Sequence, residues 1–212
     1  AMKIAQDMGV TPRVIMQTEI TDPAYLANSA DRCFHCKSHL FSDLNKIAQL
    51  EKFDCVMSGN NFDDRHDYRP GNKAAKQLGV IAPLMQAELT KNDIRQLSKQ
   101  LNLPTADMPA SPCLASRISY GLQVTEERLS QVEQAENFLR SLGLIEFRVR
   151  HHDTVARIEA KPQDMAKIMQ AATQIVEKLK AIGFKFVSLD LQGFRSGALN
   201  ESLTEEEKQK NL

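Results

Sequence analysis

The sequence has few cysteines, no excess of either charge and no long apolar run. Four cysteines in 212 residues are too few for a disulfide scaffold. Lysine plus arginine equals aspartate plus glutamate at 27 each, so the formal net charge is zero. Proteins that hold a nucleic-acid backbone normally present a basic surface, and the balanced charge therefore argues against a nucleic-acid partner.

Signals for membrane insertion or export are also missing from the sequence. No apolar run approaches the roughly 18 residues of a membrane span, and the stretch AMKIAQDMGV at the start lacks the apolar core of a signal peptide. We therefore expect a cytoplasmic protein with no membrane partner. With 42% hydrophobic residues the chain can bury one good core or two smaller ones, and we expect two modest domains.

Residues 1–121 show alternating strand and helix patterns and are predicted to form the first domain. The order strand, helix, strand, helix predicts a parallel sheet covered by helices, which is an α/β fold. Ligands bind at the carboxyl ends of the strands in such sheets, so the loop 60–71 is a candidate binding site. The predicted strands are residues 12–20 and 53–59, and the predicted helices are residues 38–51, 72–80 and 90–103.

Residues 122–212 are predicted to form a second, smaller domain. Its elements follow the order α-β-β-α-β, which describes a two-layer α+β unit. The first helix begins at Thr125, and Pro162 lies in the first turn of the second helix. The predicted helices are residues 125–143 and 162–183, and the predicted strands are residues 145–152, 154–160 and 184–191.

The cysteines divide into a close pair and two single residues. Cys33 and Cys36 form a C-x-x-C pair, which in a reducing compartment is more often metal-binding or catalytic than a structural disulfide. Cys113 lies far downstream in PASPCLASRISYG. Cys55 lies in the apolar stretch FDCVMSG, and we expect it to be a small buried hydrophobic residue.

Several motifs resemble those of a known family. DRCFHCK, GNNFDDRHDYRPG, LTKNDIRQLSKQLNLPTADMPASPCLASRISYG, RVRHHDTVARIEA and LDLQGFRSGALN resemble successive motifs of the LarE family, almost from end to end of the chain. The resemblance implies an adenine-nucleotide alpha-hydrolase-like domain of the ATP-pyrophosphatase (PP-loop) type, followed by a domain for substrate binding and oligomerisation. It implies ATP and Mg²⁺ as cofactors and a homo-oligomer.

The activity that the resemblance implies is ATP-dependent sulfur transfer. A carboxylate of a pyridinium dicarboxylate mononucleotide would be adenylated and converted to a thiocarboxylate, in the biosynthesis of the nickel-pincer cofactor. Two other functions remain open at this point. One is a tRNA-thiolating enzyme of the same broad group, which the balanced charge disfavours. The other is a non-catalytic module that binds a metal or a nucleotide.

One family feature, the phosphate-binding SGGxDS loop, does not occur in this sequence. Such loops present backbone N–H groups to phosphate, and nothing else in the chain easily replaces one. We expect an N-terminal segment with this loop to precede residue 1, and these 212 residues alone to be inactive. The alternative is a naturally truncated relative that no longer activates ATP.

The three cysteines Cys33, Cys36 and Cys113 resemble the pattern of those family members that hold a [4Fe–4S] cluster on three cysteines. The resemblance implies that these three residues together hold such a cluster. Three thiolates leave one coordination position open for an exchangeable sulfide, whereas a fourth ligand closes the site as in structural zinc centres. The alternatives are a zinc site completed by a histidine such as His35 or His39, and a disulfide or persulfide pair.

The resemblance also implies roles for individual residues. Asn61, Asp63 and Arg69 match positions of the nucleotide site, although Asn and Asp also favour loops through turn chemistry. The arginines of RVR alternate along a strand and face one way, which suits a phosphate but also describes exposed edge charges. The implied sets are Cys113 and Arg117 for catalysis, Gly59, Asn61, Asp63 and Arg69 for ATP, and Arg148, Arg150, Glu136, Glu159 and Arg195 for the substrate.

Overall fold

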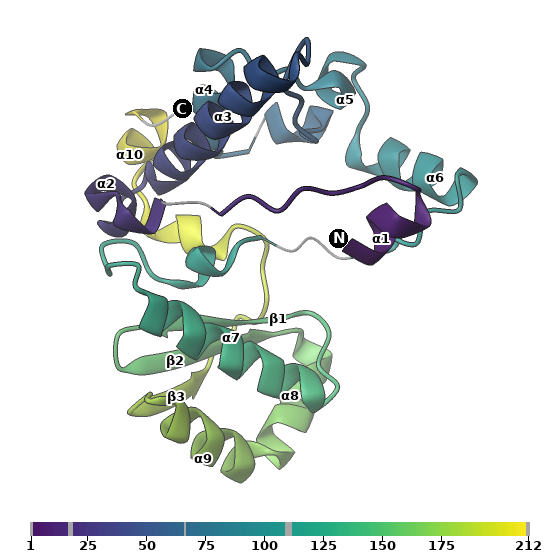
Figure 1. The fold of residues 1–212 in the computed structure, drawn as a ribbon. Coiled ribbons are helices and arrows are strands. Elements are labelled where there is room, and N and C mark those ends of the chain that lie inside the picture. The colour runs from purple at the N-terminus through teal and green to yellow at the C-terminus, as the bar shows by residue number, and fades with distance from the viewer. Residues whose placement is uncertain (1, 17–18, 66, 109–111, 211–212) are drawn as a thin grey trace. The chain divides into compact units, whose positions relative to one another are not determined.

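The computed structural model describes residues 2–16, 19–65, 67–108 and 112–210 (Figure 1). The chain divides into two compact units. The first unit contains the described residues of 1–19 and 33–110, and the second contains those of 20–32 and 111–211. Among the described residues, no helix is both long enough and apolar enough to cross a membrane.

The first unit is mainly helical. Its longest helix, α3, follows a helical spacing of apolar residues as expected, but it begins six residues before the predicted start and so includes the C-x-x-C pair. Thr90 caps α6 by a capping box with Asp93, as its sequence predicts. The helices are α1 (Met2–Asp7), α3 (Arg32–Glu51), α4 (Gly71–Gln77), α5 (Pro83–Gln86) and α6 (Lys91–Gln100), with a 3₁₀ turn η2 (Phe62–Arg65).

The parallel sheet predicted for the first unit is only partly visible. Residues 10–16 form no strand, and residues 17 and 18 of the predicted strand 12–20 lie outside the described residues. The predicted strand 53–59 contributes one parallel bridge, between Met57 and Ile81. A strand is stable when a neighbour accepts and donates its backbone hydrogen bonds, and this stretch has one such partner in the described part. The parallel nucleotide-binding sheet therefore stays a prediction.

The prediction that Cys55 is buried is wrong, because Cys55 is exposed. The apolar residues around it are also solvent-accessible, with Phe53 at 64% and Met57 at 63% relative exposure. The apolar run predicted a strand over residues 53–59, and this segment forms one bridge, at Met57. The run did not identify which residues pack over that segment, because burial depends on other parts of the chain.

The second unit has the predicted α-β-β-α-β order, with one difference. The predicted helix 162–183 consists of two helices that meet at Ala171, which ends one helix and begins the next. Strand β1 pairs antiparallel with β2, and β2 pairs parallel with β3, in the order β1-β2-β3. The elements are α7 (Glu126–Ser141), β1 (Phe147–His152), β2 (Val155–Ala160), α8 (Pro162–Gln170), α9 (Ala172–Ile182) and β3 (Phe186–Leu189).

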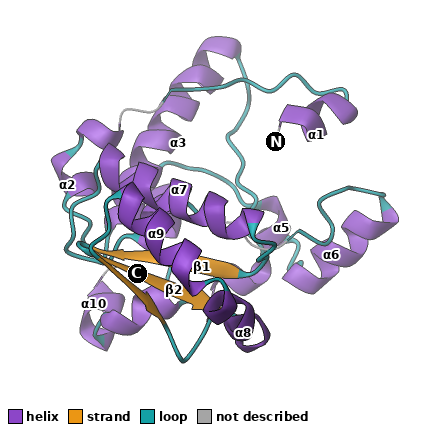
Figure 2. Ribbon diagram, turned by 90° about the horizontal axis from the view of Figure 1, so that it is seen from below, coloured by secondary structure: helices purple, strands orange, loops and turns teal. Residues whose placement is uncertain are grey.

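The core of the second unit lies between one face of this sheet and the helices α7, α8 and α9, which cover the same side (Figure 2). Alternate residues of each strand point to opposite faces, so the odd-numbered residues of β1 and the even-numbered residues of β2 are the core-facing ones. The opposite face carries the charged residues of RVR and RIE. The core residues include Leu139, Phe147, Val149, Ile158, Ile168, Ile175 and Leu179.

Short elements complete the second unit. Asp22 is the N-cap of the short helix α2, because its side chain accepts a hydrogen bond from the backbone N–H of Ala24 at 2.9 Å. Glu205–Lys210 is a short helix with no buried residue. These elements are η1 (Glu19–Thr21), α2 (Pro23–Leu26), η3 (Leu114–Arg117), η4 (Ala198–Ser202) and α10 (Glu205–Lys210).

His151 is a titratable residue inside this core. It is 2% exposed and its ring lies 4.9 Å from that of Phe184. One ring nitrogen, Nε2, lies 2.8 Å from Oε1 of Gln131. Burial, and next the positive charge of Arg128, lowers the pKa of His151 to about 4. The imidazole is therefore neutral in the folded protein at neutral pH.

We predict that His151 makes the folded protein less stable in mild acid. In the unfolded chain its pKa is ordinary, about 6.5, so between that pH and about 4 the unfolded state binds more protons. The free energy of unfolding therefore falls as the pH drops through this window, by up to about 3 kcal/mol at ~1.4 kcal/mol per unit. Urea unfolding of wild type and His151→Gln at pH 7 and pH 4.5 measures it. An equal loss in both proteins would contradict this assignment.

Candidate functional site

Cys113 lies at the start of a tight turn in the second unit. It is exposed and directly precedes the 3₁₀ turn η3. Its backbone carbonyl accepts hydrogen bonds from the N–H of Ser116 at 3.0 Å, from the hydroxyl of Ser116 at 2.7 Å and from Nη1 of Arg117 at 3.1 Å. The thiol is therefore carried on a backbone that is held by several donors.

Arg117, the predicted catalytic cation, is buried and paired with a glutamate. Its Nε lies 2.9 Å from Oε1 of Glu136, and its Nη2 lies 3.2 Å from Oε2 of the same carboxylate. Glu136, on α7, also accepts the backbone N–H of Val149 at 3.2 Å. Glu136 is therefore buried, with its carboxylate fully engaged in these contacts. The contacts of Arg117 brace the cysteine turn and fasten it to α7 and β1.

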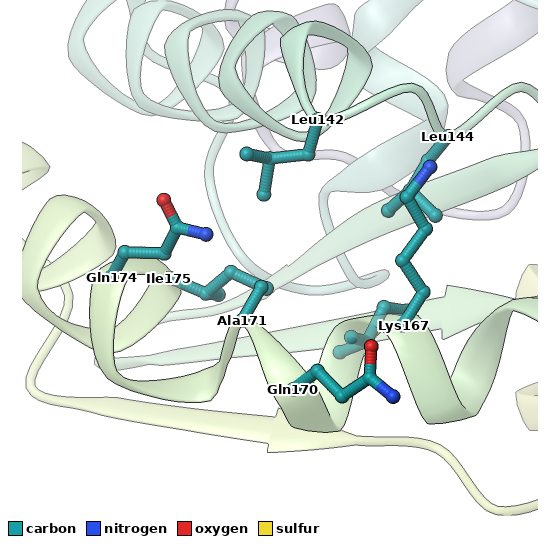
Figure 3. A pocket seen from close by; sticks show the side chains of 8 residues that line it. Leu142, Leu144, Lys167, Gln170, Ala171, Gln174 and Ile175 are labelled. Carbon is teal, nitrogen blue, oxygen red and sulfur yellow. The ribbon is translucent and has the colours of Figure 1, made fainter.

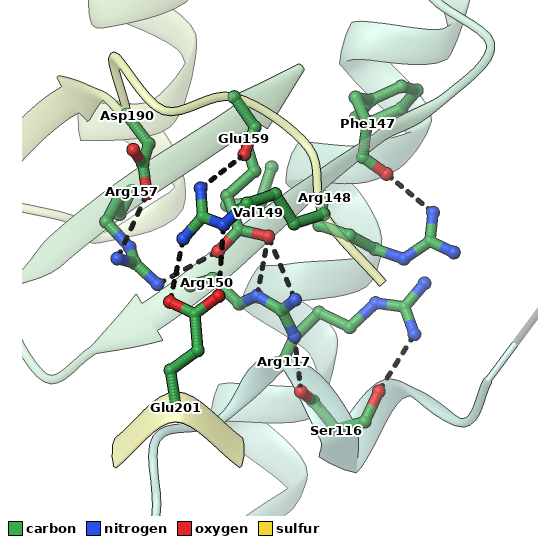
Figure 4. Close-up of polar contacts among 12 residues, drawn as sticks. Ser116, Arg117, Phe147, Arg148, Val149, Arg150, Arg157, Glu159, Asp190 and Glu201 are labelled. Atoms are coloured by element: carbon green, nitrogen blue, oxygen red, sulfur yellow. Dashed lines mark hydrogen bonds and ion pairs between the residues drawn. The ribbon is translucent and has the colours of Figure 1, made fainter. Parts of the chain in front are cut away.

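A second buried ion-pair group covers the polar face of the sheet (Figure 4). Glu159 is fully buried and is bound by Arg150 at 2.9 Å and by Arg157 at 2.9 Å. Arg150 also donates to the backbone carbonyl of Ser116 at 2.8 Å, which connects the group to the cysteine turn. Arg157 forms a further ion pair with Asp190 at 3.1 Å. One carboxylate thus holds two arginines on neighbouring strands.

The two arginines of RVR differ in environment, although both lie on the polar face as predicted. Arg150 is 6% exposed, so the description of an exposed edge charge is wrong for it. Arg148 is half-buried and lies over the ring of Phe194, 5.0 Å from its centroid. Its Nη1 donates to the carbonyl of Phe147 at 2.6 Å. Burial, and next the positive charge of Arg117, lowers the pKa of Arg148, and Glu136 acts in the opposite direction.

Arg195 lies in the turn after β3 and is bound to a nearby carboxylate. Its Nε and Nη2 donate to the two oxygens of Glu201 at 3.0 and 2.9 Å, and its Nη1 donates to the carbonyl of Gly193 at 3.1 Å. The hydrogen bond to Glu201 raises the pKa of Arg195. This bidentate arrangement closes the loop between β3 and η4.

The C-x-x-C pair lies at the beginning of α3 in the first unit. Cys33 and Cys36 are three positions apart, so their side chains lie on the same face of the helix. Both are half-buried. Gly71, the first residue of α4, lies against this part of α3, because a Cβ at position 71 would come within 2.9 Å of Lys37 and 3.5 Å of the carbonyl of Cys33. The glycine of YRPG thus brings the candidate loop next to the cysteine pair.

In the candidate loop, Asn61 and Asp63 form turn and capping contacts. Asn61 accepts the backbone N–H of Asp63 at 3.0 Å through its side chain, and Asp63 accepts the backbone N–H of Lys91 at 2.8 Å, at the start of α6. Arg69 pairs with the buried Asp64 at 2.8 Å. Gly59 is exposed and follows the bridge at Met57. These contacts give Asn61 and Asp63 a structural role in addition to the predicted nucleotide role.

The described residues show no preformed metal group. Within residues 2–16, 19–65, 67–108 and 112–210, no three His, Cys, Asp or Glu side chains gather in a way that could hold a metal ion. A pocket of about 250 Å³ lies elsewhere in the second unit, where the end of α7 faces the junction of α8 and α9 (Figure 3). Its lining contains none of the predicted site residues and includes Leu142, Leu144, Lys167 and Gln174.

Sequence reasoning missed several residues of the polar face. Arg157 alternates with Glu159 in RIE, so the period of two that identified RVR could have identified it. His152 was also missed. Its Nδ1 lies 2.8 Å from the hydroxyl of Ser119, and burial, followed by the nearby Arg157, lowers its pKa. Asn28 carried no sequence signal for the contacts it makes.

Comparisons with known proteins identify the family. No family model matches the chain. An uncharacterised protein from Synechocystis is 41% identical over 202 residues, which cover 94% of this chain and 75% of the relative. A protein from Lactiplantibacillus plantarum is 35% identical over 204 residues, covering 96% of this chain and 74% of the relative. An uncharacterised protein from Methanocaldococcus jannaschii is 32% identical over 171 residues, covering 81% of this chain and 67% of the relative.

The Lactiplantibacillus plantarum relative is a pyridinium-3,5-bisthiocarboxylic acid mononucleotide synthase. The present chain belongs to the LarE family, as this synthase does. The resemblance of the sequence motifs to that family is therefore confirmed.

We predict that Arg150→Ala destabilises the second unit strongly. Removing one partner of a buried ion pair leaves an uncompensated charge, which typically costs about 3–5 kcal/mol. Arg148→Ala, on the same face but half-buried, should cost only ~1 kcal/mol, mostly through its lost contact with Phe194. Urea unfolding followed by circular dichroism measures both values.

The double variant Arg150→Met with Glu159→Leu is the control for this prediction. It should recover much of the lost stability, because no buried charge of the pair remains and Arg157 keeps its ion pair with Asp190. An Arg150→Ala variant as stable as wild type would contradict the buried-pair interpretation.

Proposed function

We propose that this protein is an ATP-dependent sulfur transferase that converts a carboxylate of a pyridinium dicarboxylate mononucleotide to a thiocarboxylate, in nickel-pincer cofactor biosynthesis. The observation that carries the proposal is the exposed Cys113 on a braced turn that is hydrogen-bonded, through Ser116, to the arginine-rich face of the second unit. Membership of the LarE family supports it. In this proposal the protein is a cytoplasmic homo-oligomer.

The reaction has two stages. A carboxylate oxygen of the substrate attacks the α-phosphorus of ATP, pyrophosphate leaves, and an acyl adenylate forms. A sulfur nucleophile then attacks the carbonyl carbon, and the C–O bond to AMP breaks. A thiolate is a strong nucleophile near neutral pH. If Cys113 itself attacks, a thioester forms, and release of the thiocarboxylate requires loss of the Cα proton and cleavage of the Cβ–S bond, which leaves dehydroalanine. If Cys113 holds a sulfide, that sulfide attacks and becomes the sulfur of the thiocarboxylate.

The ATP-binding residues proposed are Gly59, Asn61, Asp63 and Arg69, and the carboxylate of Asp63 would hold Mg²⁺. Asp63 is exposed and carries one described contact to the backbone of Lys91, which leaves carboxylate oxygen for a cation. We also propose that residues 1–121 form the nucleotide-binding domain and that residues 122–212 form the substrate-binding domain.

For the sulfur source we propose a [4Fe–4S] cluster on Cys33, Cys36 and Cys113. The side chains fit in type, since three thiolates leave one iron with an open position for an exchangeable sulfide. Cys33 and Cys36 share one helix face, so both thiolates can reach one cluster. The proposal requires that the two units bring Cys113 to this pair. The alternatives are a zinc site and a persulfide on Cys113, and metal analysis distinguishes both from a cluster.

The substrate-binding residues proposed are Arg148, Arg150, Glu136, Glu159 and Arg195. Glu136 and Glu159 act by fixing Arg117 and Arg150, since both carboxylates are buried in ion pairs. Arg148 and Arg150 face the same side of β1, and we assign them to the phosphate of the mononucleotide. In this arrangement the reacting carboxylate of the mononucleotide faces Cys113.

We predict that Cys113→Ser abolishes thiocarboxylate formation by the complete gene product and leaves substrate binding within twofold of wild type. A serine hydroxyl is not ionised near neutral pH and neither donates sulfur nor holds iron-bound sulfide. Product is measured by mass spectrometry after incubation with ATP, Mg²⁺ and the mononucleotide, with iron and sulfide analysis of the same samples.

Cys55→Ser is the matched control for Cys113→Ser, because both thiols are exposed. It should retain full activity and full iron content, whereas Cys33→Ser and Cys36→Ser should lose iron. Thiocarboxylate formation by Cys113→Ser at the wild-type rate would overturn the proposed role. Stoichiometric zinc without iron or sulfide would overturn the cluster.

We also predict that Arg148→Ala weakens binding of nicotinate mononucleotide by about ten- to a hundredfold. A charge-assisted hydrogen bond to phosphate contributes roughly 1.5–3 kcal/mol, at ~1.4 kcal/mol per decade of affinity. Calorimetric titration measures this, with Arg140→Ala as control, since Arg140 is an exposed arginine on α7. Equal affinity in wild type and Arg148→Ala would remove Arg148 from the phosphate site.

A further inference from the structure

Residues 20–32 belong to the second unit and pair with the chain that follows Cys113. The backbone N–H of Val124 donates to the carbonyl of Leu26 at 3.0 Å, and the N–H of Gly121 donates to the carbonyl of Asn28 at 3.0 Å. This segment, which precedes the cysteine pair in sequence, is therefore connected to the turn between Cys113 and α7.

The side chain of Asn28 provides the centre of this connection. Asn28 is completely buried and has a left-handed backbone with φ 53°. Its Nδ2 donates to the carbonyls of Leu122 at 2.7 Å and Ser119 at 2.8 Å, and lies 3.4 Å from the carbonyl of Ile118. A side-chain amide has two N–H groups, so the two short contacts use both. One asparagine thus satisfies carbonyls that the turn exposes to the interior.

Arg32 completes the arrangement. It is 2% exposed, and its Nη1 donates to the side-chain oxygen of Asn28 and to the carbonyl of Ala115, the latter at 2.9 Å. The same carbonyl accepts the backbone N–H of Ile118 at 3.1 Å, which closes the 3₁₀ turn. The guanidinium also lies 5.8 Å from the ring centroid of Tyr120. Arg32 therefore reaches the turn two residues beyond Cys113.

We propose that Asn28 and Arg32 are positioning residues for Cys113 in the sulfur-transfer reaction, an inference that rests on the proposed function. Cys113 is exposed, so the location of its sulfur depends on the backbone that carries it. Ser116 and Arg117 hold the Cys113 carbonyl, and Arg32 holds that of Ala115. Asn28 holds the carbonyls of Ser119 and Leu122 just after the 3₁₀ turn. Displacement of a reacting group by about 1 Å can cost about a hundredfold in rate.

The first test is Asn28→Gly in the complete gene product. Glycine accepts the left-handed backbone without strain, so this change removes the amide and spares the conformation. The kcat for thiocarboxylate formation should fall at least tenfold, with the KM for the mononucleotide within twofold. Asn102→Gly is the matched control, because Asn102 has the same φ of 53° and is exposed, and it should leave kcat unchanged.

The second test compares two substitutions of Arg32. Lysine keeps a charged donor for Ala115 and Asn28, whereas methionine keeps the length without any donor. Arg32→Lys should retain kcat within about threefold of wild type, and Arg32→Met should lose at least tenfold. If Asn28→Gly does not fold, this pair decides the question. Equal kcat in the two Arg32 variants, or a raised KM with unchanged kcat, would overturn the positioning role.

A third readout does not depend on activity. Hydrogen exchange of the Ser116 and Ile118 amides, which donate to the carbonyls of Cys113 and Ala115, should be at least tenfold faster in Arg32→Met. Exchange in β1 and β2 should not change. Unchanged exchange in the turn would overturn the inference. If wild type forms no thiocarboxylate, the proposed function fails, and this exchange measurement still shows whether the two residues hold the turn.

Discussion

The buried carboxylate of Glu159 is the constraint on which the polar face of the second unit depends. It binds Arg150 and Arg157 on two neighbouring strands, and Arg150 in turn holds the carbonyl of Ser116. A buried charge is tolerated only when its partners are in place. The strand pairing, the arginine positions and the turn that carries Cys113 are therefore interdependent.

A second buried pair repeats this logic from the helical side. Glu136 on α7 binds Arg117 of the cysteine turn and the backbone of Val149 in β1. The turn is thus held by β1, by α7 and by Arg32, the first residue of α3. For sulfur transfer this rigidity matters, since a nucleophile held in place avoids the entropic cost of aligning it for each turnover.

Local patterns predicted most helices of the first unit and most elements of the second, but the sheet predicted for the first unit is only partly visible. Alternation and helical spacing identified β1, β2, β3 and α7, and RVR was correctly placed on one face. The burial of Glu136 could not be predicted, because its partner Arg117 is nineteen positions away and no local pattern links them. The break at Ala171 has neither proline nor glycine to announce it. In the first unit, Cys55 was placed in an extended segment, but its exposure depends on packing by distant residues.

The central claim is that the product's sulfur comes from the cysteine site of this protein. Protein produced with heavy-isotope sulfur, including its bound sulfide, would undergo a single turnover with ATP and the mononucleotide in buffer without added sulfide. Mass spectrometry of the product then identifies the source. The account predicts heavy sulfur in the thiocarboxylate, and a product that forms only after light sulfide is added, and contains only light sulfur, would contradict it.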